Sequence, residues 1–194
     1  TSFDGEIQLT NKEIVPYSYF DSTGVYAKSE NKFYFTTTAF SEFRLLCIDM
    51  NTFEVNFVEP TGDLPEFMID GGIMWWDSVY NVLAFNGGYG NNGDFFIYNP
   101  TTNTMIRDYW GMYQLDETTP KAYDPVTNRF FHFIPSDRVL MQYFVVNGNG
   151  IALNGNFVQG VVPYISNSKC FIKDNKLIML YPEGYKKNVY QLDL

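Results

Sequence analysis

Basic residues are few in this sequence: 13 lysines and arginines stand against 22 aspartates and glutamates, for a formal net charge of −9. A protein that binds the phosphate backbone of nucleic acid needs a basic stripe, and so does one that adheres to an anionic membrane. The nearest feature is the single pair Lys186-Lys187. We therefore expect neither nucleic acid nor a membrane as a partner, and we interpret the acidic balance as favouring solubility.

Histidine and cysteine are also scarce, with one His and two Cys. A single histidine predicts no zinc site and no Ser-His-Asp or Cys-His catalytic arrangement. Cys47 and Cys170 each stand in an apolar, strand-like stretch, which is typical of buried reduced cysteine, although a disulfide between them stays open. No apolar run approaches the length of a membrane span, and no signal-peptide pattern opens the chain, so secreted and cytoplasmic locations are not distinguished.

Aromatic side chains are abundant, at 19% of all residues. They favour strands and bury a large area per residue. No segment keeps helical spacing of apolar residues over ten positions, while glycine, proline and asparagine clusters recur at short intervals. The sequence therefore predicts an all-β fold with almost no helix.

An asparagine followed by a short apolar strand recurs four times, at Asn31, Asn81, Asn128 and Asn175, with spacings of 50, 47 and 47 residues. Asparagine tolerates a left-handed backbone and suits a hairpin turn. A residue suited to a strand stands five positions before each one: Tyr26, Trp76, Tyr123 and Cys170. Each repeat thus begins with a hairpin of two strands, a and b.

A second turn follows at a regular distance in the first three repeats, at residues 49–52, 99–103 and 147–150, with an apolar strand on either side. These strands are c and d. Four antiparallel strands in each unit of nearly 50 residues are the signature of propeller blades. We predict a single domain over residues 1–194, a four-bladed β-propeller with blades at about 24–59, 72–110, 121–159 and 168–194.

The fourth repeat contains strands a, b and c but no strand d. Read across the two ends of the chain, Leu192-Asp193-Leu194 joined to Asp4-Gly5-Glu6-Ile7 looks like another c–d turn. We therefore expect residues 5–14 to form an N-terminal strand that completes the last blade, which would remove the open edges of the ring. A rival interpretation makes the chain part of a larger ring, or one half of an eight-bladed dimer.

The second repeat carries a recognisable motif, in which Phe85-Asn86-Gly87-Gly88 is followed by Tyr98-Asn99-Pro100-Thr101-Thr102. Over residues 72–110 it resembles a kelch repeat, with its Gly-Gly pair at the end of strand b and its Tyr-Asp-Pro-x-Thr-like turn. The resemblance implies a β-propeller.

The connections from b to c and from d to a share one face of a propeller, and here they are predicted to be long. Long loops on a rigid scaffold are where function usually resides. Aromatic residues gather in these loops, and stiff amphipathic aromatics are enriched at interfaces. The predicted ligand- or partner-binding residues are Tyr17, Tyr19, Phe67, Tyr89, Tyr109, Trp110, Tyr113, Tyr164 and Tyr185.

These features favour a module that binds a protein or a glycan through its aromatic, loop-rich face. The first alternative is a glycoside-cleaving enzyme that uses paired carboxylates such as Asp77 and Asp124, although a carboxylate beside a turn is more often a turn residue. The second is a structural domain of a virion or larger assembly.

His132 occupies a core position of strand b. We expect no catalytic residues, no metal site and no cofactor, apart from an ion that the carbonyls of a central channel could hold.

Overall fold

The structure is a computed structural model that describes residues 24–39, 42–68, 73–89, 92–108, 120–134, 137–158, 169–183 and 186–194. These ranges contain strands and turns but no helix, and hence no helix able to cross a membrane. The strands of the first half are β1 (Gly24–Ala27), β2 (Lys32–Ala39), β3 (Glu42–Asp49), β4 (Val55–Val58), β5 (Thr61–Gly62), β6 (Phe67–Met68), β7 (Met74–Asp77), β8 (Val82–Tyr89) and β9 (Asn92–Asn99). Those of the second half are β10 (Thr104–Asp108), β11 (Lys121–Asp124), β12 (Arg129–Ile134), β13 (Val139–Val146), β14 (Gly150–Phe157), β15 (Lys169–Lys173), β16 (Lys176–Glu183) and β17 (Lys186–Asp193).

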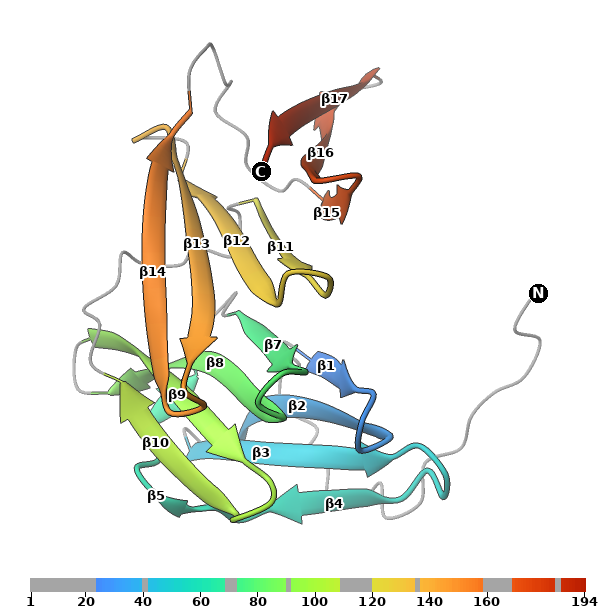
Figure 1. Cartoon of the computed structure of the whole chain (residues 1–194). Coiled ribbons are helices and arrows are strands. Elements are labelled where there is room, and N and C mark those ends of the chain that lie inside the picture. Colours follow the sequence, from blue (N-terminus) through green and yellow to red (C-terminus); the bar gives the residue numbers. More distant parts are fainter. Residues whose placement is uncertain are drawn as a thin grey trace.

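The strands form four sheets that follow one another around a common centre (Figure 1). The first blade is β1-β2-β3-β4, the second is β7-β8-β9-β10, the third is β11-β12-β13-β14, and the fourth is β15-β16-β17. The strands β1, β7, β11 and β15 lie nearest the centre, and β4, β10, β14 and β17 lie farthest from it (Figure 1). The fold is a four-bladed β-propeller, as the repeats predicted.

Each hairpin between strands a and b turns at the asparagine that marks the repeat. Asn31, Asn81, Asn128 and Asn175 all have a positive φ, between 52° and 57°. Among residues that carry a side chain, asparagine and aspartate tolerate this left-handed region best. The predicted role of the repeated asparagine is therefore confirmed.

The blades are held together by aromatic packing between neighbouring sheets. Trp75 and Trp76 are consecutive in β7 and both are buried. Successive side chains of a strand point to opposite faces of its sheet, so the pair serves two interfaces. Trp76 stacks on Tyr34 of the first blade with ring centres 6.0 Å apart, whereas Trp75 contacts Phe130 of the third blade at 5.7 Å.

The interface between the third and fourth blades is more aliphatic. Phe131, Phe133 and Leu140 pack there with Leu177 and Met179 of β16. Because a blade inside a ring has two covered faces, its strands carry apolar side chains at successive positions rather than at alternate ones.

The connections from b to c are shorter than the sequence analysis predicted. β2 and β3 are paired as far as Ala39 opposite Glu42, and β8 and β9 as far as Tyr89 opposite Asn92. Threonines and glycines that look like loop residues in sequence are therefore paired strand residues. The ladder continues because a hairpin satisfies the backbone groups of both strands whatever their side chains.

The connection from the first blade to the second is also more ordered than a loop. Thr61–Gly62 form β5, which runs parallel to β10, and Phe67–Met68 form β6, which is antiparallel to β8. The connection that leaves the first blade therefore pairs with two strands of the second blade, β10 at its outer edge and β8 in its interior.

The fourth blade contributes three strands to the described part of the chain. The predicted N-terminal strand, residues 5–14, lies outside the described residues.

A candidate binding pocket on the first blade

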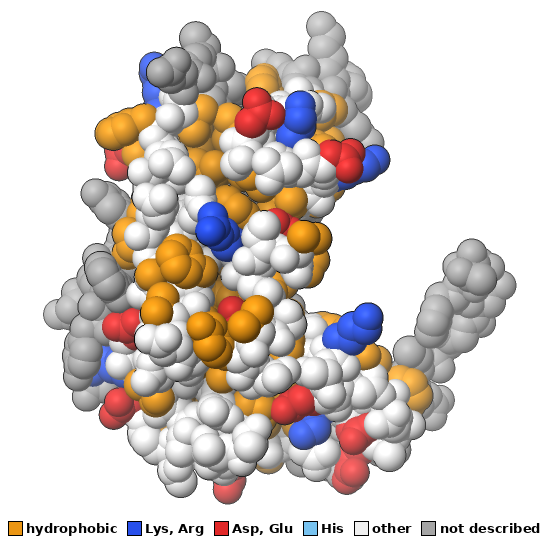
Figure 2. All heavy atoms as spheres, in the orientation of Figure 1, with side chains coloured by type: hydrophobic (Ala, Val, Ile, Leu, Met, Phe, Trp, Pro, Cys, Tyr) orange, Lys and Arg blue, Asp and Glu red, His pale blue; other side chains and the backbone are white. Residues whose placement is uncertain are grey.

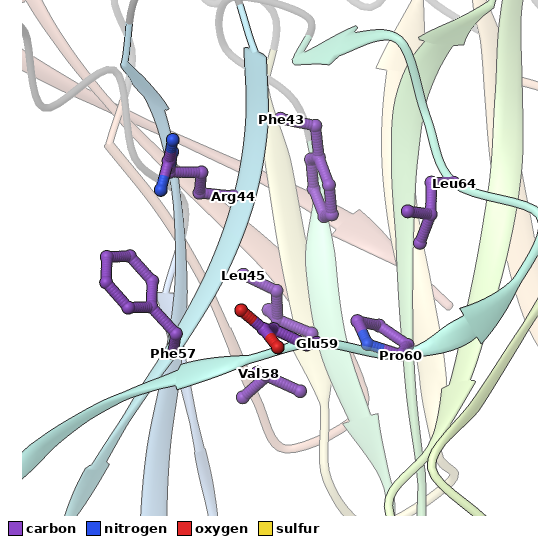
Figure 3. A pocket seen from close by; sticks show the side chains of 8 residues that line it. All are labelled: Phe43, Arg44, Leu45, Phe57, Val58, Glu59, Pro60 and Leu64. Carbon is purple, nitrogen blue, oxygen red and sulfur yellow. The ribbon is translucent and has the colours of Figure 1, made fainter.

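A pocket of about 200 Å³ opens where β4 ends (Figure 3). The eight-residue strand β3 is paired with the four-residue strand β4 only from Leu45 to Ile48. Past Val58 the chain turns towards the second blade, and within the described ranges the residues of β3 before Leu45 are not paired with β4. The pocket therefore results from the mismatch in length between two paired strands.

The lining of the pocket is mainly apolar. Arg44 and Phe57 lie on one side of β3 and Phe43 and Leu64 on the other, while Leu45, Val58 and Pro60 form the floor (Figure 3). Phe57 and Leu64 are 39% and 45% exposed, which is high for side chains of this size. An exposed apolar cluster around a concavity is typical of a binding site.

Two charged side chains border this apolar surface. The Arg44 guanidinium lies over the Phe57 ring, 5.4 Å from its centre, in cation–π geometry. Glu59, at the start of the connection to the second blade, is exposed. The pocket thus offers an aromatic wall, a cation and an anion within one small site. Elsewhere on the visible face, charges of both signs are scattered rather than gathered (Figure 2).

Most of the aromatic residues predicted to bind a partner lie outside the described part of the chain. These are Tyr17, Tyr19, Tyr109, Trp110, Tyr113, Tyr164 and Tyr185. The structure describes the backbones of Phe67 and Tyr89, both of which are strand residues rather than loop residues. Phe67 is paired with Gly88, so the two predicted residues Phe67 and Tyr89 are neighbours on adjacent strands.

Phe43, Phe57 and Leu64 were not among the predicted site residues. Phe57 stands in a strand, where a phenylalanine is expected to be buried, and Leu64 is not aromatic. The available signal was the length of strand d. Only six residues separate the end of the turn at Thr52 from Glu59, too few to cover the whole of β3.

The carboxylates considered for glycoside cleavage are turn acceptors. The Asp77 Oδ1 accepts hydrogen bonds from the backbone N–H groups of Val79 and Tyr80, both at 2.9 Å. The Asp124 Oδ1 accepts one from the Val126 N–H at 3.0 Å, and its Oδ2 accepts one from the Thr127 hydroxyl at 2.6 Å. Both side chains are buried under the turns that they stabilise, as expected of Asp residues two positions before a turn N–H.

His132 lies in the core, as its strand position predicted, and is 1% exposed. Burial, with a smaller contribution from the nearby Lys121 charge, lowers its pKa from 6.5 to about 4. The imidazole is therefore neutral at physiological pH. Cys47 is buried and Cys170 half-buried, and the two do not form a disulfide with each other. Within the described ranges, no group of three or more potential ligand side chains is arranged to hold a metal ion.

Comparison with known proteins gives no family for this chain. No family model matches the sequence, and no curated protein matches it. Among solved structures, the chain is similar to a mutant of the GH43 protein BlXynB from Bacillus licheniformis, with 8% sequence identity and a TM-score of 0.46. The match covers 88% of this chain but only 38% of that one. A similarity of this size does not extend to function.

Proposed function

We propose that this domain is a binding module and that its partner is a protein that presents an extended segment to the first-blade pocket. The supporting observation is that the pocket lies beside the part of β3 that, within the described ranges, is not paired with β4. Glu42–Arg44 of β3 continue past the end of the ladder with β4. An extended peptide can add to such an edge through its backbone while one side chain enters the adjoining pocket.

The lining favours a protein over a glycan. A sugar presents hydroxyl groups that need several polar partners, whereas only Arg44 and Glu59 among the lining residues carry polar side chains. An apolar side chain of a peptide would bury its surface against Phe43, Phe57 and Leu64. The charges at the rim would then select its neighbours in the peptide, which is the usual division between core and rim of an interface.

The location of the pocket in its blade also supports this proposal. It lies at the start of strand c and at the end of strand d, where the b–c and d–a connections meet.

A random linear peptide library displayed on phage tests this function. Peptides enriched on the wild-type domain are expected to bind Phe57→Ala and Leu64→Ala at least about tenfold more weakly, a loss of about 1.4 kcal/mol each. The matched control is Ile106→Ala on β10, where a side chain of similar exposure, 38%, lies away from the pocket. This control should bind the same peptides within about twofold.

Two results would contradict the function. One is enrichment of peptides whose binding is unchanged by Phe57→Ala and Leu64→Ala. The other is the absence of any enriched peptide, together with binding to an arrayed glycan, which would favour the glycan-binding interpretation in place of the protein-binding one.

A further inference from the structure

The outer edge of the fourth blade differs from those of the other three. In the first three blades the c strands β3, β9 and β13 are each paired with an outer d strand. In the fourth blade, β17 is paired with β16 on its inner side. Within the described ranges, no strand is paired with the outer side of β17. A free edge of this length is a template for another strand.

A groove lies beside this edge. It has a volume of about 300 Å³ and is lined by Leu140, Asn156 and Phe157 of the third blade and by Gln191 and Leu192 of β17. Phe157 is 83% exposed, which is unusual for a phenylalanine. Hydrophobic side chains are visible in the upper part of Figure 2, where the third and fourth blades meet. The groove occupies the place that a fourth strand of the last blade would fill, opposite the outer strand β14.

The register of β17 shows where such a strand would begin. Asp49 lies opposite Lys32, and Asp193 lies opposite Lys176 in the same position of its blade. The carboxylate of Asp49 accepts hydrogen bonds from the N–H groups of the c–d turn, as the Asn99 side chain does in the second blade. Asp193 is therefore the residue at which a c–d turn would start in the fourth blade.

The d strands of the first two blades share a short pattern after this turn. Phe53 and Asn103 have a positive φ, 57° and 52°, and the second residue after each, Val55 or Met105, is buried in the core. Val55 is paired with Ile48, and Met105 with Tyr98, one position before the turn acceptor. The occupant of the groove should therefore carry a residue suited to positive φ, then any residue, then an apolar one.

Residues 5–14 of this chain fit that pattern. Gly5-Glu6-Ile7 supplies glycine at the position of positive φ and isoleucine at the buried position. The length of the following connection also agrees. Ile7 precedes Gly24 by 17 residues, and the equivalent separations are 19 residues from Val55 to Met74 and 16 residues from Met105 to Lys121.

We propose that the outer edge of β17 and the groove beside it form a strand-acceptor site for residues 5–14 of the same chain. In this site Ile7 lies opposite Leu192 and Gln8 opposite Gln191, and the Ile7 side chain enters the groove towards the third blade. The Gln8 side chain lies on the other face of the sheet. The site is independent of the first-blade pocket, so its test does not depend on the proposed function.

Disulfide trapping in the full-length chain tests the register. Opposite residues of an antiparallel pair have Cβ atoms about 4.5–5.5 Å apart, close enough for a disulfide after small adjustments, whereas diagonal neighbours are about 7–8 Å apart. The variant Gln8→Cys/Gln191→Cys is expected to form the 8–191 link on mild oxidation, at a rate independent of protein concentration. The control Gln8→Cys/Val189→Cys, displaced by two residues on the same face, should link at least about tenfold more slowly.

Peptide mapping without reduction separates the engineered link from any that involves the native Cys47 or Cys170. A link that forms no faster in Gln8→Cys/Gln191→Cys than in the control would overturn the proposed register. A link that joins two chains and accelerates with concentration would show that a second copy supplies the strand, which also overturns occupancy by the same chain.

A second pair of variants tests the direction of the side chains. Ile7→Asp places a charge in the groove, whereas Gln8→Asp places the same charge on the other face. Because proteolysis reports local opening, Ile7→Asp is expected to raise the rate of cleavage within residues 1–23 at least about tenfold, and Gln8→Asp to change it by less than about twofold. Equal cleavage rates in the two variants would contradict the proposed insertion of Ile7.

Discussion

The phenol of Tyr123 joins the second and third blades near the centre of the propeller. Its hydroxyl donates a hydrogen bond to the backbone carbonyl of Trp76 at 2.6 Å and lies 2.8 Å from the Asn128 Oδ1. Trp76 is in the innermost strand of the second blade, and Tyr123 is in that of the third. We predict that Tyr123→Phe, which removes only the hydroxyl, lowers the free energy of unfolding by more than an ordinary Tyr→Phe change does.

The magnitude follows from the groups that the change leaves behind. A typical hydrogen bond contributes a net 0.5–1.5 kcal/mol or so, and a buried acceptor left without its donor costs about 1–3 kcal/mol. Since Tyr123 is half-buried and Asn128 also accepts a hydrogen bond from the Ser78 hydroxyl at 2.9 Å, the carbonyl of Trp76 bears most of the loss. We therefore expect a decrease of about 1–2.5 kcal/mol, and a fall in Tm of roughly 2–4 °C per kcal/mol for a domain of this size.

Tyr26→Phe is the matched control. The Tyr26 hydroxyl donates to Asn31 in the first blade at 2.7 Å, the same motif within one hairpin, but the side chain is exposed. Water can replace that bond, so the expected loss is below about 0.5 kcal/mol.

The assay is urea unfolding of the wild type and the two variants, followed by fluorescence, with a comparison of midpoints at equal slope. Burial, together with the charges of Asp77 and Asp124, raises the pKa of Tyr123 above its usual value. The folded state therefore retains the neutral phenol above pH about 10, where the unfolded chain ionises, and the stability of the wild type falls there. The advantage of the wild type over Tyr123→Phe should consequently shrink as the pH rises above 10. Equal losses in Tyr123→Phe and Tyr26→Phe would refute the bridging role.

Three further predictions concern stability. The pKa of His132 is about 4 in the folded state, against 6.5 for the ordinary side chain. As the pH falls from 6.5 towards 4, the unfolded state therefore binds more protons than the folded state does. The free energy of unfolding should fall in that window by up to about 3 kcal/mol. His132→Phe should flatten this pH dependence, and an unchanged slope in acid titration of the variant would contradict the assignment. Asn81→Ala at φ 52° should cost about 1 kcal/mol in urea unfolding while Asn81→Gly costs almost nothing; equal losses would mean that the backbone conformation is not the cause. The Arg107 Nε lies 2.7 Å from the Asp94 Oδ2, and both side chains are largely buried. Arg107→Met should therefore lower the free energy of unfolding by about 3 kcal/mol or more, and Arg107→Met/Asp94→Asn by less, because the double variant leaves no uncompensated carboxylate. A larger loss in the double variant would count against that cause.

The repeat could be predicted from the sequence because it is marked by residues that act locally. An asparagine in a hairpin takes a left-handed backbone for reasons that involve only its own side chain and its neighbours, and all four repeated asparagines do so. The role of Asp77 and Asp124 in their turns could be predicted for the same reason. The core position of His132 followed from its alignment with Phe35 and Phe85 in equivalent strands.

The sequence did not determine how many residues of each strand are paired with the neighbouring strand. Ladder hydrogen bonds do not depend on side-chain type, so β8 continues through Gly87 and Gly88, which were expected to end strand b. For the same reason Phe67 and Tyr89, expected in loops, became strand residues.

The sequence by itself determined the class of fold, the number of blades and the residues at the hairpin turns, because each rests on interactions between residues a few positions apart. The tertiary structure decided which aromatic residues were buried between blades and which stayed at the surface. Trp75 and Trp76 are both covered because their sheet lies between two others, whereas Phe57, in the outermost strand of the first blade, stays 39% exposed. Such differences depend on how sheets far apart in sequence meet, and no local pattern encodes them.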